Sequence, residues 1–104
     1  MSHQAVQWVL RDAPDLPPSC FAVLTGLAWH ADSEGRDSWP SEPTLAGYAR
    51  KSVRQVRRDL RDLQAAGLIR EGDQSIVAHI RADRRPTVYD LAVQETFATG
   101  HQRP

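Results

Sequence analysis

The stretch of sequence that decides the fold runs from residue 52 to residue 63 and reads SVRQVRRDLRDL. On a helix, Val56, Leu60 and Leu63 fall on one narrow apolar face, while four arginines gather on the opposite side. The serine that opens the stretch and the glutamine three residues later have the spacing of a capping box, which marks the start of a helix. The stretch therefore predicts an amphipathic helix with one buried seam and one arginine face.

The arginines lie at an end of this helix where positive charge is unfavourable. Arg54, Arg57 and Arg58 occupy its first two turns, and Arg50 and Lys51 come just before it. Cations near a helix N-terminus oppose the macrodipole and cost about 0.3–1 kcal/mol each. A helix whose N-terminal end meets phosphate groups and base edges would carry its basic residues there. The placement therefore favours nucleic-acid binding.

A second, shorter helix precedes this one. Ser41 is a suitable N-cap, and an acid and a proline fit the first turn after it. The pattern predicts a helix over residues 42–49, after which two basic residues lead into a new cap at Ser52. A short helix, a turn of a few residues and a longer second helix make a helix-turn-helix.

The N-terminal half of the chain predicts two further helices. The first is short and covers residues 3–11, and its expected apolar face consists of Val6, Val9 and Leu10. The second covers residues 19–32, and its expected apolar side consists of Cys20, Phe21, Leu24, Leu27, Ala28 and Ala31. Gly35 follows as a left-handed C-terminal cap.

Trp29 points away from the apolar side of the second of these helices, so that helix needs cover on two sides. We expect the N-terminal segment to provide the cover through Trp8 and Val9. The alternative is that Trp29 forms part of a dimer contact.

The segment after the long helix predicts a β-hairpin. Gly67 is the expected residue just beyond the helix end, and residues 68–70 read as a strand. Residues 75–80 contain β-branched side chains and predict a strand, and a basic tip follows over residues 82–86. Residues 87–91 alternate between apolar and polar side chains and predict the return strand.

The net charge of zero conceals a strong polarity along the chain. Residues 1–49 hold two basic against six acidic side chains, a net −4, whereas residues 50–104 hold eleven basic against seven acidic ones, a net +4. Five cations and no anion lie between Arg50 and Arg58. A molecule polarised in this way can bind DNA with one face while its total charge stays neutral.

Other classes of protein find little support. The single cysteine, Cys20, excludes an internal disulfide and a cysteine-based zinc site, and the histidines lack ligand spacing. The sequence has no glycine-rich phosphate loop and no catalytic motif, so we expect no enzyme, no cofactor, no metal site and no small-molecule ligand. It has no run of about 18 apolar residues and no signal pattern, so we expect a cytoplasmic, nucleoid-associated protein without a membrane span.

A family resemblance rests on the spacing of Leu45, Ala46, Ser52, Val56, Leu60, Leu63, Ala66, Gly67, Leu68 and Ile69. This spacing resembles the pattern of winged helix-turn-helix domains seen across many bacterial regulators, including the MarR-like and GntR-like groups. The piece GRDSWPS at residues 35–41 resembles helix-turn-helix domains of actinobacterial mobile elements, phages and plasmids, some of them linked to replication proteins. The likeness covers about residues 17–92.

The resemblance implies a mostly α fold with a small β-hairpin: an α+β winged helix-turn-helix with three core helices and a wing sheet of two or three strands. We expect it to span residues 17–93, after an N-terminal segment over residues 1–16 and before a frayed tail over residues 94–104. One departure stands at Arg50, where the family usually has glycine in the turn. If the turn requires a positive φ, arginine is strained there by about 1 kcal/mol. Either the turn has another shape, or the charge of Arg50 reaches phosphate.

The long helix, residues 52–66, is the recognition helix that the resemblance implies. In the resembled family, the N-terminal end of this helix lies in the major groove. Arg54 and Arg58 are then the best candidates for bidentate contacts with guanine. Gln55 could read adenine, although its capping role competes for the side chain. The expected contacts with the DNA backbone are Ser41, Thr44, Arg50, Lys51, Ser52, Arg57 and Arg61. The expected wing contacts are Arg81, Arg84 and Arg85.

Each of these contacts has a simpler alternative. The arginine stripe can be a solvated helix face paired with Asp59 and Asp62. The wing tip can be a solvated loop, and capping alone explains Ser41 equally well.

The sequence therefore predicts sequence-specific binding of double-stranded DNA by a bacterial transcriptional regulator. The first alternative is an origin-binding module of a plasmid or phage replication-initiation protein. The second is a winged helix that binds an acidic protein partner through its arginine face. A homodimer is left open, because a domain this small reads only a short site.

Overall fold

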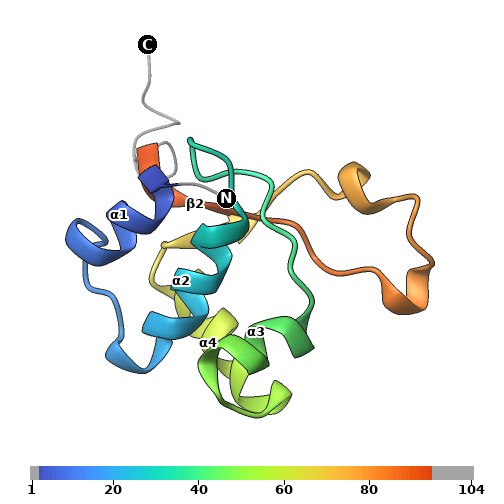
Figure 1. Ribbon diagram of the computed structural model, residues 1–104, viewed down its shortest axis with the longest axis horizontal. Coiled ribbons are helices and arrows are strands. Elements are labelled where there is room, and N and C mark those ends of the chain that lie inside the picture. Colours follow the sequence, from blue (N-terminus) through green and yellow to red (C-terminus); the bar gives the residue numbers. More distant parts are fainter. Residues whose placement is uncertain (1–2, 95–104) are drawn as a thin grey trace.

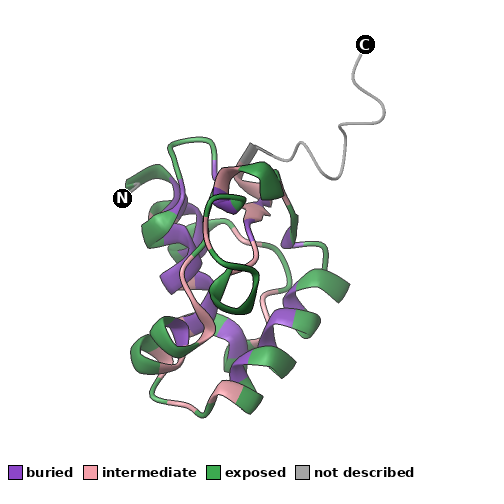
Figure 2. Ribbon diagram, turned by 90° about the vertical axis from the view of Figure 1, so that its right-hand side faces the viewer, coloured by how far each residue is buried: buried purple, intermediate pink, exposed green. Residues whose placement is uncertain are grey.

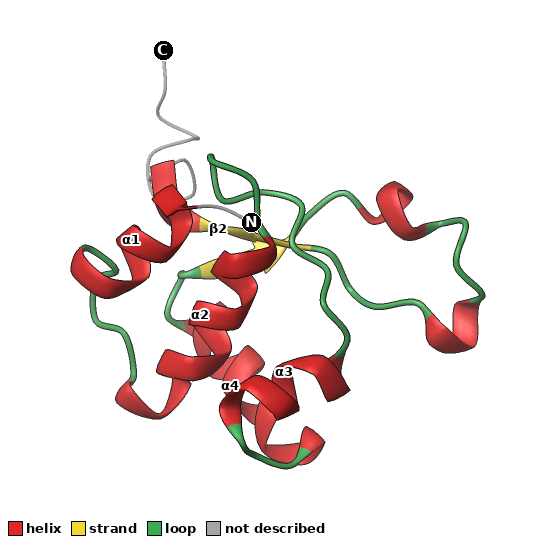
Figure 3. Ribbon diagram, in the orientation of Figure 1, coloured by secondary structure: helices red, strands yellow, loops and turns green. Residues whose placement is uncertain are grey.

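Four helices and a two-stranded sheet make up residues 3–94, the part of the chain that the computed structural model describes (Figure 1, Figure 3). The elements are α1 (His3–Arg11), α2 (Phe21–His30), α3 (Glu42–Ala49), α4 (Val53–Ala65), β1 (Ile69–Glu71) and β2 (Tyr89–Leu91). One-turn 3-10 helices lie at Pro18–Cys20, Gln74–Val77, Ala82–Arg84 and Ala92–Gln94. This is the α+β winged helix-turn-helix architecture that the sequence predicts. From residue 95 on, the predicted tail lies outside the described residues.

Hydrogen bonds at successive helix ends define the helix-turn-helix. The Ser41 hydroxyl accepts the backbone N–H of Thr44 (3.2 Å) and so caps α3. Arg50 ends α3 in the left-handed conformation, with φ 58° and ψ 45°. Ser52 and Gln55 then form the predicted capping box. The Ser52 hydroxyl accepts the Gln55 N–H (3.1 Å), and the Gln55 side chain accepts the Ser52 N–H (3.0 Å). These bonds fix where α4 begins.

The predicted buried seam of α4 is confirmed. Val56, Leu60 and Leu63 are each at most 4% exposed, and they join one core with residues from the other helices and the sheet. Helix α2 lies at the centre, with α1 on one side and α3 and α4 on the other (Figure 1). Figure 2 shows buried residues on the inward sides of the helices and exposed residues on the outward sides. A fully buried leucine contributes about 1.5–3 kcal/mol, which holds the arginine side of α4 in solvent.

Helix α1 forms where the sequence predicts it, but it buries a different face. Ala5, Trp8 and Val9 are buried, whereas Leu10 is 60% exposed. The expected face with Leu10 is wrong because burying the large indole of Trp8 removes more apolar surface from water. Trp8 and Val9 pack into the core beside α2 as predicted, but Trp29 stays 47% exposed.

The apolar side of α2 also differs from the prediction. Val23 is buried, and Phe21 is 43% exposed. The 3-10 turn Pro18–Cys20 comes directly before α2, and its tighter winding changes the direction in which Phe21 points. Gly35 has the expected left-handed φ of 85°. It lies in a turn closed by its N–H to the backbone oxygen of Asp32 (2.9 Å), not at the end of α2.

The wing contains a short sheet. β1 and β2 pair antiparallel, with Ile69 opposite Leu91. Ser38 adds an isolated bridge to Tyr89, and its hydroxyl donates to the backbone oxygen of Leu27 in α2 (2.7 Å). The loop before α3 is thereby fastened to both the sheet and the helical core. The chain between the strands extends away from the helices (Figure 1).

Residues 75–80 do not form the expected strand. The Asp73 carboxylate accepts the N–H and the hydroxyl of Ser75 (3.0 and 2.6 Å), and this cap starts a 3-10 turn. The side-chain amide of Gln74 donates to the Val88 backbone oxygen and accepts the Val88 N–H, at 2.9 Å each. The Gln74 side chain thus satisfies the backbone groups of Val88 that a neighbouring strand would otherwise pair with. Turn chemistry and one long-range contact therefore override the strand preference of the β-branched residues.

Candidate nucleic-acid interface

The exposed side of α4 carries the arginines that the sequence places there. Arg54, Arg57, Arg58 and Arg61 are all exposed, and the opposite side of the helix is buried. Within residues 3–94, no hydrogen bond or ion pair engages the guanidinium groups of Arg54, Arg58 and Arg61. We call these four arginines the basic face. Guanidinium groups without a carboxylate partner can form charge-assisted, bidentate hydrogen bonds with an anionic ligand.

Arg57 differs from its neighbours in the basic face. Its Nε donates to Oε1 of Glu42 at 2.9 Å, and this contact joins α4 to the first turn of α3. The side chains are 61% and 39% exposed, so the pair contributes less than about 1 kcal/mol. A contact this weak can be exchanged for one with phosphate.

Lys51 points into the protein. Its Nζ lies 2.6 Å from Oδ2 of Asp59 and also donates to the backbone oxygen of Ser19. The Asp59 side chain is 1% exposed and the Lys51 side chain 22%. The ion pair joins the turn between α3 and α4 to α4 itself and to the segment before α2. The phosphate contact predicted for Lys51 would have to break this pair.

The position of Asp59 is the one sequence signal for this buried pair. Asp59 lies on the same side of α4 as Val56 and Leu63, and an acid on an apolar face needs a partner there. The alternative of pairing between Asp59 and the arginine stripe is wrong, because the basic face points the other way and Lys51 supplies the charge.

Residues at the helix caps have their side chains occupied. The Ser41 hydroxyl caps α3 and also donates to Oγ1 of Thr44 (2.9 Å). Gln55 and Ser52 hold the capping box of α4. If Gln55 contacted adenine, its side chain could no longer accept the hydrogen bond from the Ser52 N–H. Caps of this kind contribute about 0.5–2 kcal/mol.

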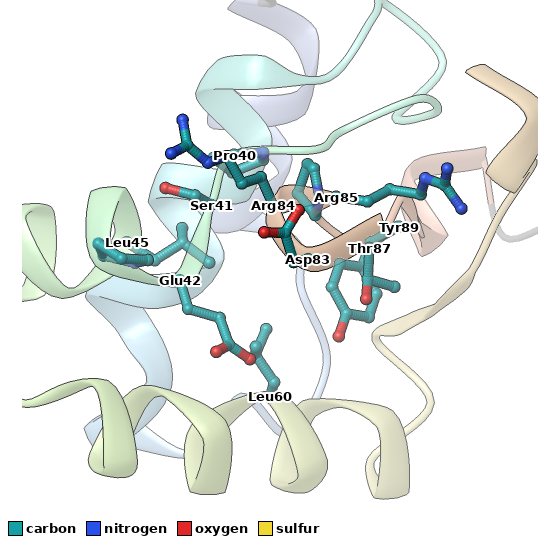
Figure 4. Close-up of a pocket in the computed structure, with 12 residues that line it drawn as sticks. Pro40, Ser41, Glu42, Leu45, Leu60, Asp83, Arg84, Arg85, Thr87 and Tyr89 are labelled. Atoms are coloured by element: carbon teal, nitrogen blue, oxygen red, sulfur yellow. The ribbon is translucent and has the colours of Figure 1, made fainter. Parts of the chain in front are cut away.

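The three wing arginines are placed differently from one another. Arg81 pairs with Asp83 (3.2 Å), and Arg85 donates to two backbone oxygens of its own loop (3.0 Å each). Arg84 has no such bond within the described chain, and it lines a cleft of about 360 Å³ between the wing and the start of α3 (Figure 4). Figure 4 shows Arg84 and Arg85 extending in opposite directions. Arg84 is therefore the wing arginine best able to reach a ligand.

The turn requires a positive φ at Arg50, since φ is 58° there. The first of the two alternatives, a turn of another shape, is thus wrong. Arg50 is exposed, next to the basic face, and a non-glycine residue in this conformation costs about 1–2 kcal/mol. Arginine therefore occupies a site where glycine would be less strained.

Replacing Arg50 with glycine should raise the free energy of unfolding by about 0.5–1 kcal/mol, because relief of strain exceeds the added entropy of the unfolded chain. Urea denaturation of both proteins measures the difference. The matched control is Arg61→Gly, the same exchange at an exposed position in the interior of α4, where glycine should lower stability by about 1 kcal/mol. A loss of stability in Arg50→Gly would show that the turn does not strain arginine.

Three side chains of types that can bind a metal ion lie close together, two of them on α4. The ligand atoms of Cys20, Asp59 and Asp62 are within 4.8 Å of one another. Burial, and next the charge of Asp59, raise the pKa of the Cys20 thiol, so it stays protonated. The Lys51 ammonium already occupies one oxygen of Asp59. A protonated thiol and an adjacent cation both oppose binding of a divalent metal ion.

Comparison with known proteins identifies the central part of the chain. A family model described as a helix-turn-helix domain matches residues 15–69, more than half of the chain. The matched region spans α2, α3 and α4, ends at the first residue of β1, and supports a helix-turn-helix DNA-binding domain. Neither a curated protein nor a solved structure matches the chain. None of the described helices has the length and apolar character needed to cross a membrane.

Proposed function

The chain belongs to this family of helix-turn-helix domains, and we propose that it binds double-stranded DNA sequence-specifically as a bacterial transcriptional regulator. The observation that carries the proposal is the basic face of α4, where Arg54, Arg58 and Arg61 have no partner in the described chain. Arginines left unneutralised near the N-terminus of a capped helix suit phosphate groups and guanine edges.

In the proposed complex, the N-terminal half of α4 enters the major groove. Arg54 and Arg58 are one turn apart, which separates them by about 6 Å along the helix axis and brings both to neighbouring base pairs. Each can donate two hydrogen bonds to O6 and N7 of a guanine. These two residues would then determine the preferred sequence.

Contacts with the phosphate backbone would position the helix without reading sequence. We assign them to Arg50, Arg57 and Arg61 around α4 and to Arg84 in the wing, because these side chains are exposed and, within residues 3–94, unpaired or weakly paired. We leave Lys51 out of this set, since its ammonium group is held by Asp59. Two copies on a site with two-fold symmetry are part of the proposal, because one recognition helix reads only a short sequence.

Selection of bound duplexes from a random DNA pool tests the proposal directly. We expect an enriched motif, and log–log salt dependence with a slope of about −0.9 for each phosphate contact, or roughly −3.6 for the four assigned here. Arg61→Ala should reduce the slope by about 0.9. Arg36→Ala, which removes an exposed arginine paired with Glu34 in the loop after α2, is the matched control and should not change it.

Failure to bind any duplex at low salt would contradict the proposal and favour an acidic protein partner for the basic face. If duplexes are bound, the genomic location of the motif separates the two roles in DNA metabolism. Motifs upstream of genes support a regulator, whereas clustered repeats at an origin would support a replication-initiation protein instead.

A further inference from the structure

The cleft between the wing and the helix-turn-helix has the dimensions of a small-molecule site, and we call it the wing cleft. Its volume is about 360 Å³, and sites for small ligands have volumes of about 300–1,000 Å³. Wing residues between 83 and 89 line one side, residues between 40 and 45 line the other, and Leu60 of α4 lies below them (Figure 4). A ligand in the wing cleft would therefore contact the wing, α3 and α4 at once.

The wing cleft has an apolar floor between rigid walls. Leu45 and Leu60 are core residues, 1% and 4% exposed, so the cleft extends down to the buried interior. The other apolar surfaces are rings, which belong to Tyr89, Pro40, Pro43 and Pro86. Proline rings lose no rotamer freedom when a ligand packs on them, so these walls are preformed. Facing walls of this kind suit a flat aromatic group.

Arg84 supplies a positive charge that no side chain of residues 3–94 pairs with. The two acids in the lining are already paired with arginines: Glu42 with Arg57 (2.9 Å) and Asp83 with Arg81 (3.2 Å). Figure 4 shows the side chain of Arg84 extending from the wing toward the opposite side of the cleft. A guanidinium group without a partner forms strong, bidentate hydrogen bonds with a carboxylate. The free charge at the wing cleft therefore favours an anion.

The inner part of the wing cleft disfavours negative charge. Burial, and next the charges of Glu71 and Glu42, raise the pKa of the Tyr89 phenol, which therefore stays neutral. The same burial and the same carboxylates would oppose an anionic group of a ligand beside Tyr89. A ligand with one carboxylate should consequently place it at the exposed Arg84 and its apolar part over Leu60.

We propose that the wing cleft binds a small aromatic carboxylic acid, with its carboxylate on the Arg84 guanidinium and its ring between the walls, over Leu45 and Leu60. No sequence motif predicts this ligand, because the two sides of the cleft lie far apart in the chain. A bound acid would occupy the wing side chain that we assign to phosphate, so it would weaken DNA binding. That consequence rests on the proposed function, whereas binding of the acid does not.

NMR titration of the isotope-labelled, DNA-free chain with matched naphthalene derivatives tests the proposal. Naphthaleneacetate carries a carboxylate, naphthaleneethanol a hydroxyl and naphthaleneethylamine an ammonium group on the same ring system. We expect naphthaleneacetate to bind with a dissociation constant of about 0.2–2 mM, as is usual for a ligand of roughly 14 non-hydrogen atoms. The largest shifts should occur at amides of the wing cleft, such as Leu45 and Tyr89. The alcohol should bind at least about fivefold more weakly, and the amine more weakly still.

Arg84→Gln is the variant that removes the charge while keeping a polar side chain. It should weaken naphthaleneacetate at least about fivefold and leave binding of the alcohol unchanged. The matched control is Arg36→Gln, at an exposed arginine outside the wing cleft, which should bind naphthaleneacetate as the original chain does. Circular dichroism should show both variants folded, since both side chains are exposed.

Four results would overturn the proposal. They are absence of shifts at the wing cleft up to about 5 mM naphthaleneacetate, equal affinity for the acid and the alcohol, tightest binding of the amine, and equal weakening by Arg84→Gln and Arg36→Gln. Tightest binding of the amine would mean that Glu42 and Asp83, and not Arg84, determine the charge of the ligand.

A competition assay on the selected DNA motif tests the consequence for the proposed function. Naphthaleneacetate at about three times its dissociation constant should lower the affinity for DNA about two- to fourfold, and sodium acetate at the same concentration controls for ionic strength. Arg84→Gln should be insensitive to the acid. Unchanged affinity of the original chain would overturn the competition for Arg84. If the chain binds no duplex at all, the proposed function fails, and the DNA-free titration still decides whether the wing cleft binds the acid.

Discussion

Replacement of Lys51 by methionine is expected to lower the free energy of unfolding by about 3–5 kcal/mol, the range for a buried ion pair that loses one partner. Methionine keeps the length and the apolar part of the side chain but removes the ammonium group. Asp59, 1% exposed, then retains a carboxylate whose Oδ1 already has no hydrogen-bond partner in the described chain. Since small domains are stable by only about 5–15 kcal/mol, thermal or urea denaturation should show a large shift.

Two further variants separate the buried pair from general effects of removing a cation. Arg57→Met breaks the exposed pair with Glu42 and should cost less than about 1 kcal/mol. The double variant Lys51→Met/Asp59→Leu replaces both charges by apolar groups and should recover much of the stability, giving a coupling energy in a double-mutant cycle. Equal losses for Lys51→Met and Arg57→Met would contradict the internal role of Lys51.

The second large effect concerns DNA. Arg58→Ala should cost about 1–3 kcal/mol of binding free energy on the selected motif, roughly a 5- to 150-fold loss of affinity, and very little on random duplex. The reason is that a bidentate contact with one guanine is lost while the phosphate contacts remain. Arg54→Ala should act in the same way at a neighbouring base pair. Fluorescence anisotropy with the motif and with single-base variants measures both.

Arg61→Ala is the control for this experiment, because it removes an exposed arginine of the same helix that we assign to phosphate. It should weaken binding to all duplexes alike and leave base preference intact. If Arg58→Ala and Arg61→Ala weaken the motif and random DNA by the same factor, the assignment of Arg58 to base reading is wrong.

The helix-turn-helix could be predicted because its signals are local. The caps at Ser41 and Ser52 are recognisable within four residues of sequence. The signal that ends α4 is equally local. Gly67, two residues beyond the helix, has a left-handed φ of 77°, and Leu68 donates its N–H to the backbone oxygen of Leu63 (3.0 Å). The exposed arginine side of α4 could be predicted from the helical spacing of Val56, Leu60 and Leu63, since burial of one side determines the exposure of the other.

The parts that sequence reasoning missed depend on contacts between distant segments. Residues 75–80 look β-branched, but Gln74 bonds to Val88, fourteen residues later, and this contact decides the path of the wing. Lys51 looks like one more cation at a DNA-binding edge, and only the folded chain places it against Asp59 and Ser19. In the wing, the partner Val88 lies outside the window in which a local pattern can be recognised. For Lys51, the acid on the apolar side of α4 was visible in the sequence, but the side chain that pairs with it was not.

Lys51 is also the chain's single lysine, among thirteen lysine and arginine residues. Apart from the α-amino group, an acylating reagent therefore has one amine to modify, and that amine is held by two oxygen atoms at the turn before α4. Modification requires the ammonium group to leave these two oxygen atoms, so its rate reports the free energy of opening this contact, in the way that amide hydrogen exchange does for the backbone. A mass spectrometer can follow that reaction in the native chain without any engineered label.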